Sequence, residues 1–511
     1  MVAPMSRRST DADADAAAAA EAGNAGARRR SGRGSWLTAI AIAKATGGDV
    51  LQRGIAAHGV TTDSRGDCTG QLFVALRGAN HDAHVFVAAA VQAGAAGLLV
   101  ARPRHELGDL DRALANRANA PFVVRVADTG KALLDLAGEH RRRHRAKVVG
   151  ITGSCGKTST KEWLGAVLAA AMPTVRSPGS FNNQIGVPLT LFSIEPDTRA
   201  AVVEIGTNAP GEIAQLSAVA RPDVGIVTCV AAAHLEGLGS LEGVAREKAA
   251  LPAALPEGGL CILNGDDAAC RAMAAVTKAD VQFTSVTRAT DWFATDVRFH
   301  SLGTTFLLQG ERPVTVPRLG THNVYNALAV IAAASRLGVA EELILQALAK
   351  VPSAARRLEP KCAGGVTVFD DTYNMNPQSA AAALQAIAGL GGVGRRIAVF
   401  GEMLELGEQS EALHRGVGAE AARTRQDLLL CVGPGAGPIA DGAIAAGMSA
   451  RQVHRVADIT AAFDLLRELA RAGDRILCKA SRRVALDRLV DRLLADLGSA
   501  DDSKAAENGA S

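Results

Sequence analysis

Short apolar runs recur along this chain and alternate with longer, alanine-rich segments. Near the N-terminus, the runs at residues 72–76 and 97–101 are separated by an alanine-rich stretch at 84–93. A short apolar run bounded by turn residues indicates a buried strand, whereas a longer alanine-rich segment indicates a helix. The pattern predicts a small α/β domain over residues 35–145.

The same alternation continues through the middle of the chain. Apolar runs at 148–152, 201–205 and 224–228 are separated by helical stretches, and a helix is predicted over 323–337. Repeating strand and helix units favour a mostly parallel sheet, which binds ligands at the carboxyl ends of its strands. We expect a central domain over residues 146–352.

A third α/β region follows, with strand-like runs at 366–370, 396–400 and 427–432. It predicts a C-terminal Rossmann-like domain over 353–496. The glycine-rich segment 433–437 resembles a dinucleotide-binding turn, but an ordinary glycine loop is the favoured interpretation. The end segments 1–34 and 497–511 are small, polar and charged, so we expect both to be disordered. The predicted fold class is therefore α/β with three domains.

Composition narrows the possible partners. The chain has 511 residues and a net charge of only +3, so its overall charge gives no reason to expect a nucleic acid partner. No apolar run approaches the roughly 20 residues of a membrane helix. The eight cysteines form no Cys-x-x-Cys pair, which is typical of the reducing cytoplasm. We therefore expect a cytoplasmic protein with neither a nucleic acid nor a membrane partner.

The strongest chemical signal is the segment 148–160, in which an apolar strand runs into a Gly-Lys-Thr turn. Backbone N–H groups of such a turn bind nucleotide phosphates, and the following helix adds its positive end. Lys157 is placed to reach the β- and γ-phosphates, and Thr158 to bind Mg²⁺. Ile151 stands where the usual motif has glycine, and a chance Gly-Lys-Thr turn is the alternative. The segment predicts an ATP site.

Other polar residues follow the central strands. Glu204 ends one predicted strand and His234 follows another, and both side-chain types bind Mg²⁺ or its water. Asn182 and Asn183 form a polar turn that could grip a sugar or a carboxylate. For each of these residues a purely structural role is the alternative.

These motifs together resemble the Mur ligases. The shared segments, in order, are 152–158, 182–183, 204–206, 233–236, 263–267 and 320–327, and the resemblance covers residues from about 60 to 488. In the last region, 370–379, 401–407 and His414 resemble the members that add D-alanyl-D-alanine. The Asp-Asn-Pro-Arg motif of the sibling that adds diaminopimelate or lysine is absent.

The resemblance implies an ATP-dependent ligase. ATP would phosphorylate the terminal carboxylate of a UDP-N-acetylmuramoyl-tripeptide, and the amine of D-alanyl-D-alanine would attack the resulting acyl phosphate. This is the last cytoplasmic step in making the peptidoglycan precursor. We expect ATP and one or two Mg²⁺ ions as cofactors, and a monomer.

The resemblance also assigns site residues. The expected catalytic residues are Lys157, Lys248, His234 and Arg357. The expected ATP-binding residues are Thr152, Gly153, Ser154, Cys155, Gly156, Lys157, Thr158, Ser159, Asn323, Asn326 and Asp371. The expected metal ligands are Thr158, Glu204, His234 and Lys248, the last as a carbamate formed with CO₂. The UDP substrate is assigned to Ser64, Arg65, His84, Asn182 and Asn183, and D-alanyl-D-alanine to Tyr373, Asn374, Asn376, Lys479 and Ser481.

Several alternatives stay open. A sibling ligase would add another amino acid, and a nucleotide-dependent regulator would keep the ATP site without ligation. The third residue of the tripeptide is either diaminopimelate or lysine. Lys248 could instead be a solvated helix lysine. Met375, Arg356 and Ala480 stand where the family usually has alanine, glycine and glycine, which puts the acceptor contacts in question.

Overall fold

A computed structural model describes residues 35–78, 81–115, 120–300, 303–352 and 355–508. The expected N-terminal tail, residues 1–34, lies outside these residues. The chain divides into two compact units. The first comprises residues up to 150, 172–206 and 214–222, and the second comprises 151–171, 207–213 and the chain from 223 onward. In the described residues no helix is both long and apolar enough to cross a membrane.

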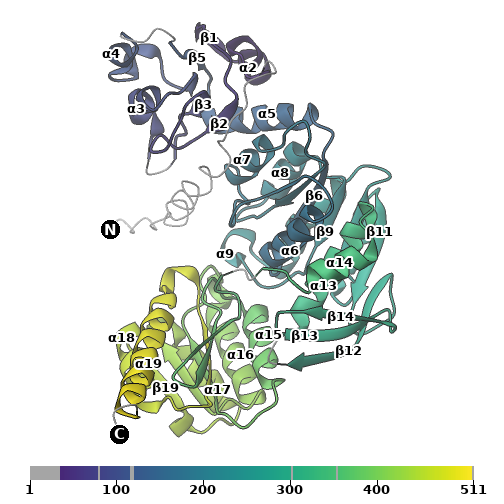
Figure 1. Cartoon of the computed structure of the whole chain (residues 1–511), viewed down its shortest axis with the longest axis vertical. Helices are drawn as coiled ribbons and strands as arrows, with labels where there is room; N and C mark the ends of the chain where they lie inside the picture. The colour runs from purple at the N-terminus through teal and green to yellow at the C-terminus, as the bar shows by residue number, and fades with distance from the viewer. Residues whose placement is uncertain (1–34, 79–80, 116–119, 301–302, 353–354, 509–511) are drawn as a thin grey trace. The chain divides into compact units, whose positions relative to one another are not determined.

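The first unit contains a five-stranded sheet. Its strands, in spatial order, are β1 (Asp49–Gln52), β5 (Phe122–Arg125), β4 (Gly97–Val100), β3 (Gln71–Val74) and β2 (Gly59–Thr61). Only the pairing of β1 with β5 is antiparallel. Successive side chains point to opposite faces, so Leu72 and Phe73 enter two separate cores. Helices α2 (Ala39–Thr46) and α5 (Thr129–Arg142) cover one face, while α3 (Val87–Gln92) and α4 (Leu110–Leu114) cover the other (Figure 1).

The first compact unit continues past residue 145 and so comprises more of the chain than the predicted N-terminal domain. Helix α7 (Gly186–Phe192) packs against α5 and β2. The buried guanidinium of Arg141 donates a hydrogen bond to the carbonyl of Ala220 at 3.0 Å. Helix α7 and most of α8 (Glu212–Ala220) therefore belong to the first unit, to which they are joined by the packing of α7 and the hydrogen bond at Ala220.

The central sheet has nine strands in the order β14-β13-β12-β11-β10-β9-β6-β8-β7. The strands are β6 (Lys147–Thr152), β7 (Thr174–Arg176), β8 (Ala200–Glu204), β9 (Val224–Val227), β10 (Leu260–Asn264), β11 (Asp280–Ser285), β12 (Trp292–His300), β13 (Gly303–Leu308) and β14 (Arg312–Val316). The predicted strands at 148–152, 201–205 and 224–228 are confirmed. An antiparallel extension of β12, β13 and β14 was not predicted.

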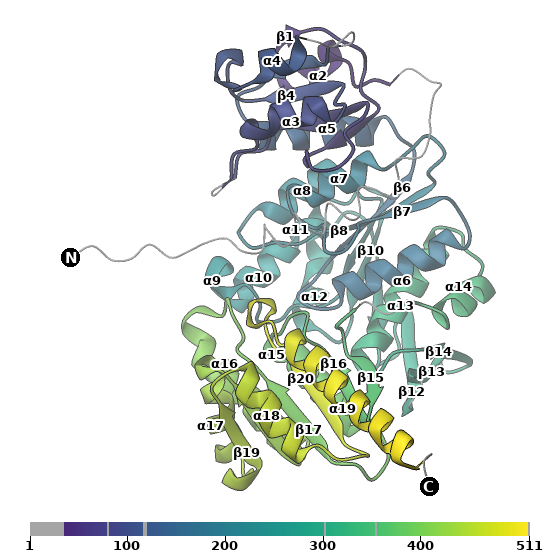
Figure 2. The same cartoon turned by 60° about the vertical axis from the view of Figure 1, so that its left-hand side comes forward.

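Helices α6 (Lys157–Ala169), α13 (Thr321–Arg336) and α14 (Glu341–Leu348) pack against one another beside this sheet (Figure 2). Helix α13 is apolar around most of its circumference, and eleven of its residues are buried. A helix that is apolar on all sides is one that is enclosed by protein. Its first turn therefore holds its polar residues in fixed positions, among them Asn323 and Asn326.

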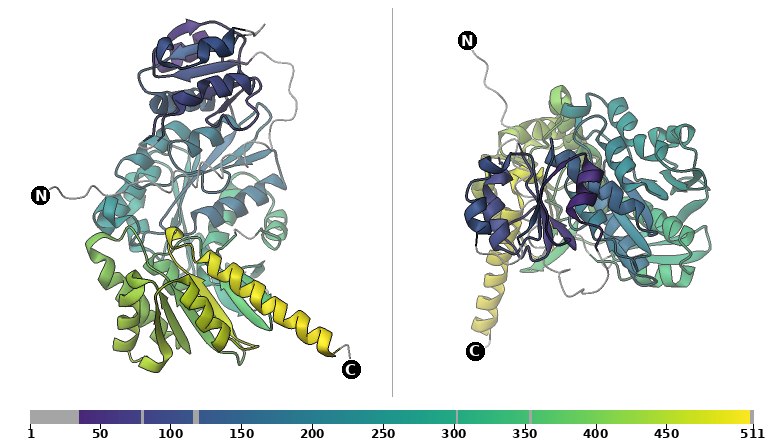
Figure 3. Two further views of the ribbon diagram at one scale, coloured as in Figure 1. Left: turned by 90° about the vertical axis from the view of Figure 1, so that its left-hand side faces the viewer. Right: turned by 90° about the horizontal axis from the view of Figure 1, so that it is seen from above.

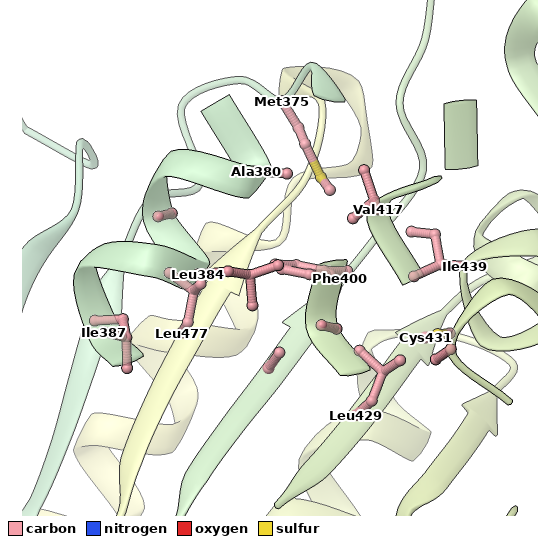
Figure 4. Packing of buried hydrophobic residues seen from close by; sticks show 14 of the residues in the cluster. Met375, Ala380, Leu384, Ile387, Phe400, Val417, Leu429, Cys431, Ile439 and Leu477 are labelled. Atoms are coloured by element: carbon pink, nitrogen blue, oxygen red, sulfur yellow. The ribbon is translucent and has the colours of Figure 1, made fainter. Parts of the chain in front are cut away.

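The C-terminal region is a six-stranded sheet in the order β15-β16-β20-β17-β18-β19, as predicted for a Rossmann-like domain. Its strands are β15 (Glu359–Ala363), β16 (Val366–Asp370), β17 (Arg396–Phe400), β18 (Leu428–Val432), β19 (Val453–Val456) and β20 (Arg475–Lys479), and only β15 runs antiparallel. Helices α15 (Pro377–Ala388), α16 (Ser410–Arg423) and α17 (Gly437–Ala445) pack over one core (Figure 4). The unusual residue Met375 fills part of this core and is 3% exposed.

Helices α18 (Ile459–Leu469) and α19 (Asp487–Asn508) cover the opposite face of the C-terminal sheet. Helix α19 continues to Asn508, where a disordered tail from residue 497 was expected (Figure 3). The tail contains alanine, lysine and glutamate, which propagate a helix once packing has started it. Arg356, which replaces a usual glycine, has a left-handed φ of 60° and its guanidinium lies 2.5 Å from the carboxylate of Asp487.

Candidate active site

The phosphate loop joins β6 to α6 and contains two glycines whose backbone φ angles are positive. Gly153 has a φ of 146° and Gly156 a φ of 83°. A Cβ atom on Gly153 would lie 1.8 Å from the Thr228 hydroxyl, and one on Gly156 would lie 2.6 Å from Oδ1 of Asn326. Only glycine fits at these two positions, so the loop is closely enclosed although Ile151 departs from the usual motif.

Side chains of the loop hold its shape. The Ser154 hydroxyl donates to the carbonyl of Ala231 at 3.0 Å and accepts from the backbone N–H of Ala231 at 2.9 Å. Nζ of Lys157 donates to the carbonyl of Gly153 at 2.7 Å. Lys157, Thr158 and Ser159 form the first turn of α6, whose unpaired N–H groups and positive end attract anions. The predicted phosphate site therefore has its positive charge already in place.

Asn326 and Asn323 support the loop from α13. The amide of Asn326 donates to Oδ1 of Asn323 at 3.2 Å and accepts from the Thr160 hydroxyl at 3.1 Å. Asn323 donates to the carbonyl of Leu319 at 2.7 Å. Both asparagines are buried. The hydrogen bond between Thr160 and Asn326 holds α13 against α6. The buried Thr152 hydroxyl has no hydrogen-bond partner among the described residues.

Arg357 is brought beside the loop from a position 199 residues away in the sequence. Its Nη2 donates to the Thr158 hydroxyl at 3.0 Å. The guanidinium also lies over the ring of Tyr373, 4.2 Å from the ring centroid. Three residues predicted for the catalytic, metal and acceptor roles are therefore in one contact network.

Lys479 forms a buried ion pair behind Tyr373. Its ammonium lies 2.7 Å from the carboxylate of Asp371 and 2.8 Å from the carbonyl of Asn374, to which it donates. Burial raises the pKa of Asp371, although the charges of Lys479 and Arg357 oppose this. The pair fixes the loop of Tyr373 and Asn374 to strand β20.

The other two predicted acceptor residues also have structural partners. Asn376 caps α15 by accepting from the backbone N–H of Ser379 at 2.9 Å, and its amide contacts the thiol of Cys155 at 3.1 Å. The Ser481 hydroxyl is buried and accepts from the backbone N–H of Leu404 at 2.9 Å. Asn376 thus links the phosphate loop to the start of a C-terminal helix.

His234 begins the short helix α9 (Leu235–Leu238) with a left-handed φ of 55°. Its Nδ1 lies 2.7 Å from a carboxylate oxygen of Glu405. The hydrogen bond with His234 lowers the pKa of Glu405, although burial opposes the shift. Glu405 itself has a φ of 64°, and a strained backbone at both partners is typical of a functional position. This partner of His234 was not predicted, because the two residues are 171 positions apart.

Lys248 ends helix α10 (Leu241–Lys248) and is only 2% exposed. The alternative of a solvated lysine is therefore wrong. Within the described part of the chain its ammonium forms no ion pair. Burial, reinforced by the charge of Lys157, lowers the pKa of Lys248 from 10.5 to about 7. The lowered pKa favours the neutral amine of Lys248.

The first unit holds the other predicted metal ligand. Glu204 ends β8, is 1% exposed and accepts a hydrogen bond from the amide of Asn182 at 2.9 Å. A Cβ atom on Gly206 would lie 2.7 Å from the same amide. The side-chain oxygen of Asn183 accepts from the backbone N–H groups of Ile185 and Gly186. Asn182 therefore orients Glu204, and Asn183 shapes the turn.

The residues predicted to bind the UDP substrate differ in how accessible their side chains are to a ligand. Arg65 is exposed and pairs with Asp63 at 2.8 Å, beside Ser64. His84 is 2% exposed, and both ring nitrogens are occupied, by Asp82 at 2.5 Å and by the backbone N–H of Ala101 at 2.8 Å. The ring of His84 supports the fold in this structure and is not open to a ligand.

No cluster of three or more histidine, cysteine or carboxylate side chains able to hold a metal occurs in the described residues. A hydroxyl, an imidazole and a carboxylate are nevertheless the donors that Mg²⁺ uses when phosphates and water complete its shell. Thr158, His234 and Glu204 are donors of these types. Lys248 is buried and its pKa is lowered, which favours the neutral amine that carbamate formation requires. The donor set therefore fits Mg²⁺.

Known families match two stretches of the chain. The Mur ligase middle domain matches residues 151–334. The Mur ligase glutamate ligase domain matches residues 356–482. Together they cover the phosphate loop, most of α13 and the whole of the C-terminal sheet.

Individual relatives match almost over their full length. The chain is 37% identical to the UDP-N-acetylmuramoyl-tripeptide–D-alanyl-D-alanine ligase of Bacillus subtilis over 86% of this chain and 93% of that protein. The Escherichia coli protein of the same name is also 37% identical, over 87% of this chain and 96% of that protein. A crystal structure of MurF from Acinetobacter baumannii superimposes with a TM-score of 0.80 at 30% identity, over 90% of this chain and 99% of that one.

Proposed function

Because this chain belongs to the Mur ligase family, we propose that it joins D-alanyl-D-alanine to UDP-N-acetylmuramoyl-tripeptide in an ATP-dependent reaction. The observation that carries the proposal is the identity of 37% to relatives named for this reaction, over at least 93% of their length. A carboxylate does not condense with an amine in water because its oxygen is a poor leaving group. The γ-phosphoryl group of ATP therefore goes first to the tripeptide carboxylate, and the dipeptide amine then displaces phosphate.

The residues around the phosphate loop act by binding and orienting charge. Loop N–H groups and Lys157 neutralise the triphosphate, and Arg357 holds the Thr158 hydroxyl in its orientation. Glu405 orients the imidazole of His234 by its bond to Nδ1. When bound, Mg²⁺ withdraws charge from the transferring phosphoryl group. We assign its binding to Thr158, Glu204, His234 and the carbamate of Lys248.

Carbamylation of Lys248 is part of this proposal. A free ammonium would repel the metal, whereas a carbamate supplies the negative oxygen that Mg²⁺ prefers. Formation of a carbamate from CO₂ requires a neutral amine as nucleophile. The burial of Lys248 and its pKa of about 7 support this chemistry.

The acceptor dipeptide is assigned to the loop of Tyr373 and Asn374, with Asn376 beside it. Lys479 and Ser481 are positioning residues, because their polar groups already bind within the fold. Asp371 likewise acts through Lys479. Their task is to hold the loop in one conformation beside Arg357.

The donor is assigned to Ser64 and the exposed Arg65 in the first unit. Contacts far from the reacting carboxylate bind ground state and transition state alike. We expect S64A and R65A to raise the KM for the UDP-tripeptide while the KM for ATP stays nearly constant. Unchanged donor KM values in both variants would show that this segment is only a charged turn.

A comparison of amine acceptors tests the overall reaction. Purified protein is incubated with ATP, Mg²⁺ and a UDP-N-acetylmuramoyl-tripeptide whose third residue is either diaminopimelate or lysine. Each mixture then receives D-alanyl-D-alanine, D-glutamate or no amine. We expect ADP release to depend on D-alanyl-D-alanine, and the better tripeptide identifies the donor. Release driven by another amino acid would indicate a sibling ligase, and release with no amine dependence would indicate a nucleotide-binding regulator. We expect the reaction in the cytoplasm, where thiols such as the eight free cysteines stay reduced.

A further inference from the structure

Two cysteines from distant parts of the sequence meet at the phosphate loop. Cys155 lies within the loop, and Cys229 follows strand β9. The backbone N–H of Ser154 donates to the carbonyl of Cys229 at 2.9 Å, which places the two chain segments side by side. The Cys229 thiol donates to the carbonyl of Cys155 at 3.7 Å, so the side chain of Cys229 lies against the residue that carries the other thiol.

The two thiols differ in chemical character. The neighbouring side chain of Cys229, a contact with the amide of Asn376 at 3.1 Å and the charge of Lys157 lower the pKa of Cys155 to about 6, although burial opposes the shift. The side chain of Cys155 and burial raise the pKa of Cys229. A thiolate is the nucleophile in thiol chemistry, so this pair consists of an attacking sulfur and a neighbouring thiol that can resolve its product.

The other thiols lack this arrangement. Burial alone raises the pKa of Cys261 to about 12, and it is the largest cause of the raised pKa of Cys270 and Cys431. Cys362 is exposed on strand β15. Cys362 therefore provides an internal reference for an accessible cysteine.

We propose that Cys155 and Cys229 are an oxidation site that responds to hydroperoxides. The Cys155 thiolate attacks the peroxide O–O bond and forms a sulfenic acid. The leaving oxygen takes up a proton and departs as water from hydrogen peroxide, or as an alcohol from an organic hydroperoxide. The Cys229 sulfur then attacks the Cys155 sulfur, loses its own proton and displaces the sulfenic oxygen as water. Overall, two thiols and one hydroperoxide give one disulfide, one water and one water or alcohol.

The disulfide distorts the phosphate loop. An S–S bond is about 2.05 Å long, much shorter than the distance of closest approach of two unbonded sulfur atoms, so the loop must move toward β9. The loop has no slack for this, because Gly153 packs against Thr228 and Gly156 against Asn326. Oxidation also removes the contact of Cys155 with Asn376. This step rests on the proposed ATP site, and we expect nucleotide affinity to fall at least about tenfold.

The test uses the full-length protein with hydrogen peroxide. Reduced wild type, C229S and the matched control C362S are treated, digested without reductant and analysed by mass spectrometry, and the Kd for MgADP is measured in parallel. In wild type and C362S we expect a disulfide-linked peptide pair that joins Cys155 to Cys229 and is reversed by dithiothreitol. Saturating MgATP should slow formation of this disulfide. The disulfide-linked protein should bind MgADP with a higher Kd than the reduced protein. In C229S, dimedone should label Cys155 as a sulfenic acid.

Two results would overturn the proposal. One is oxidation of Cys362 in wild type before any linkage of Cys155 to Cys229. The other is linked protein that binds MgADP as tightly as reduced protein. Failure of the ATP assignment is distinguishable, because reduced wild type would then bind no MgADP whether or not the disulfide forms.

Discussion

Lys248 offers a quantitative prediction, because its burial sets how much of its amine can react with CO₂. At pH 7 a lysine with the ordinary pKa of 10.5 has about one neutral amine in 3,000, whereas a pKa of about 7 makes close to half neutral. The neutral fraction available for carbamylation is therefore about a thousandfold greater than for a surface lysine. We expect the carbamate to disappear as the pH falls below about 7, because protonation removes the nucleophile.

The assay combines ¹³C-labelled bicarbonate with ligation kinetics. We expect wild type to show a labelled carbamate carbonyl by NMR, and K248A to lose both this signal and most turnover. Acetate or propionate should partly restore turnover in K248A by occupying the vacated oxygen position. The control K131A alters an exposed lysine that pairs with Asp135, and it should change neither measurement. Full turnover in K248A, or no labelled carbonyl in active wild type, would refute the reasoning.

Other substitutions separate catalytic from structural roles. K157A should fold normally and lower kcat by at least about a hundredfold, as loss of a transition-state charge contact does, and near-normal turnover would exclude the phosphate-loop assignment. H84A should lower the free energy of unfolding by about 1–3 kcal/mol in urea titrations and leave the donor KM unchanged. Burial opposes ionisation of Asp82, but hydrogen bonds from His84 and Arg102 outweigh it and hold the pKa of Asp82 at about 2, below the unfolded value of 3.8. Its contribution to stability is thus present above pH 4 and lost as the pH falls through 2, a loss that H84A should reduce. K479A should cost about 3–5 kcal/mol in the same titration, because Asp371 loses its buried cation, and the double variant with D371N and K479M should recover part of that loss.

Local pattern predicted at least two strands in each of the three sheets, because a buried strand is a short apolar run between turns. These strands are β3, β4, β6, β8, β9, β16, β17 and β18. Local pattern did not identify the antiparallel strands β13 and β14, although residues 304–308 and the turn at Gly310 carry a weak signal. The limits of the first compact unit depend on contacts such as Arg141 with Ala220, which no local pattern encodes.

The candidate site shows the same division. The phosphate loop is contiguous in sequence, so its residues were predicted together. The partners of His234 and Cys155 were not, since Glu405 and Cys229 become neighbours only through the fold. The burial of His84 likewise depends on Asp82 and Ala101 meeting its ring.

The path of one oxygen atom tests the central claim most directly. UDP-N-acetylmuramoyl-tripeptide labelled with ¹⁸O in its terminal carboxylate is incubated with the protein, ATP, Mg²⁺ and D-alanyl-D-alanine. The ¹⁸O content of the inorganic phosphate and of the pentapeptide product is then measured by mass spectrometry. An acyl-phosphate ligase transfers one labelled oxygen to inorganic phosphate for each pentapeptide formed. Formation of ADP with unlabelled phosphate and no pentapeptide would contradict the account.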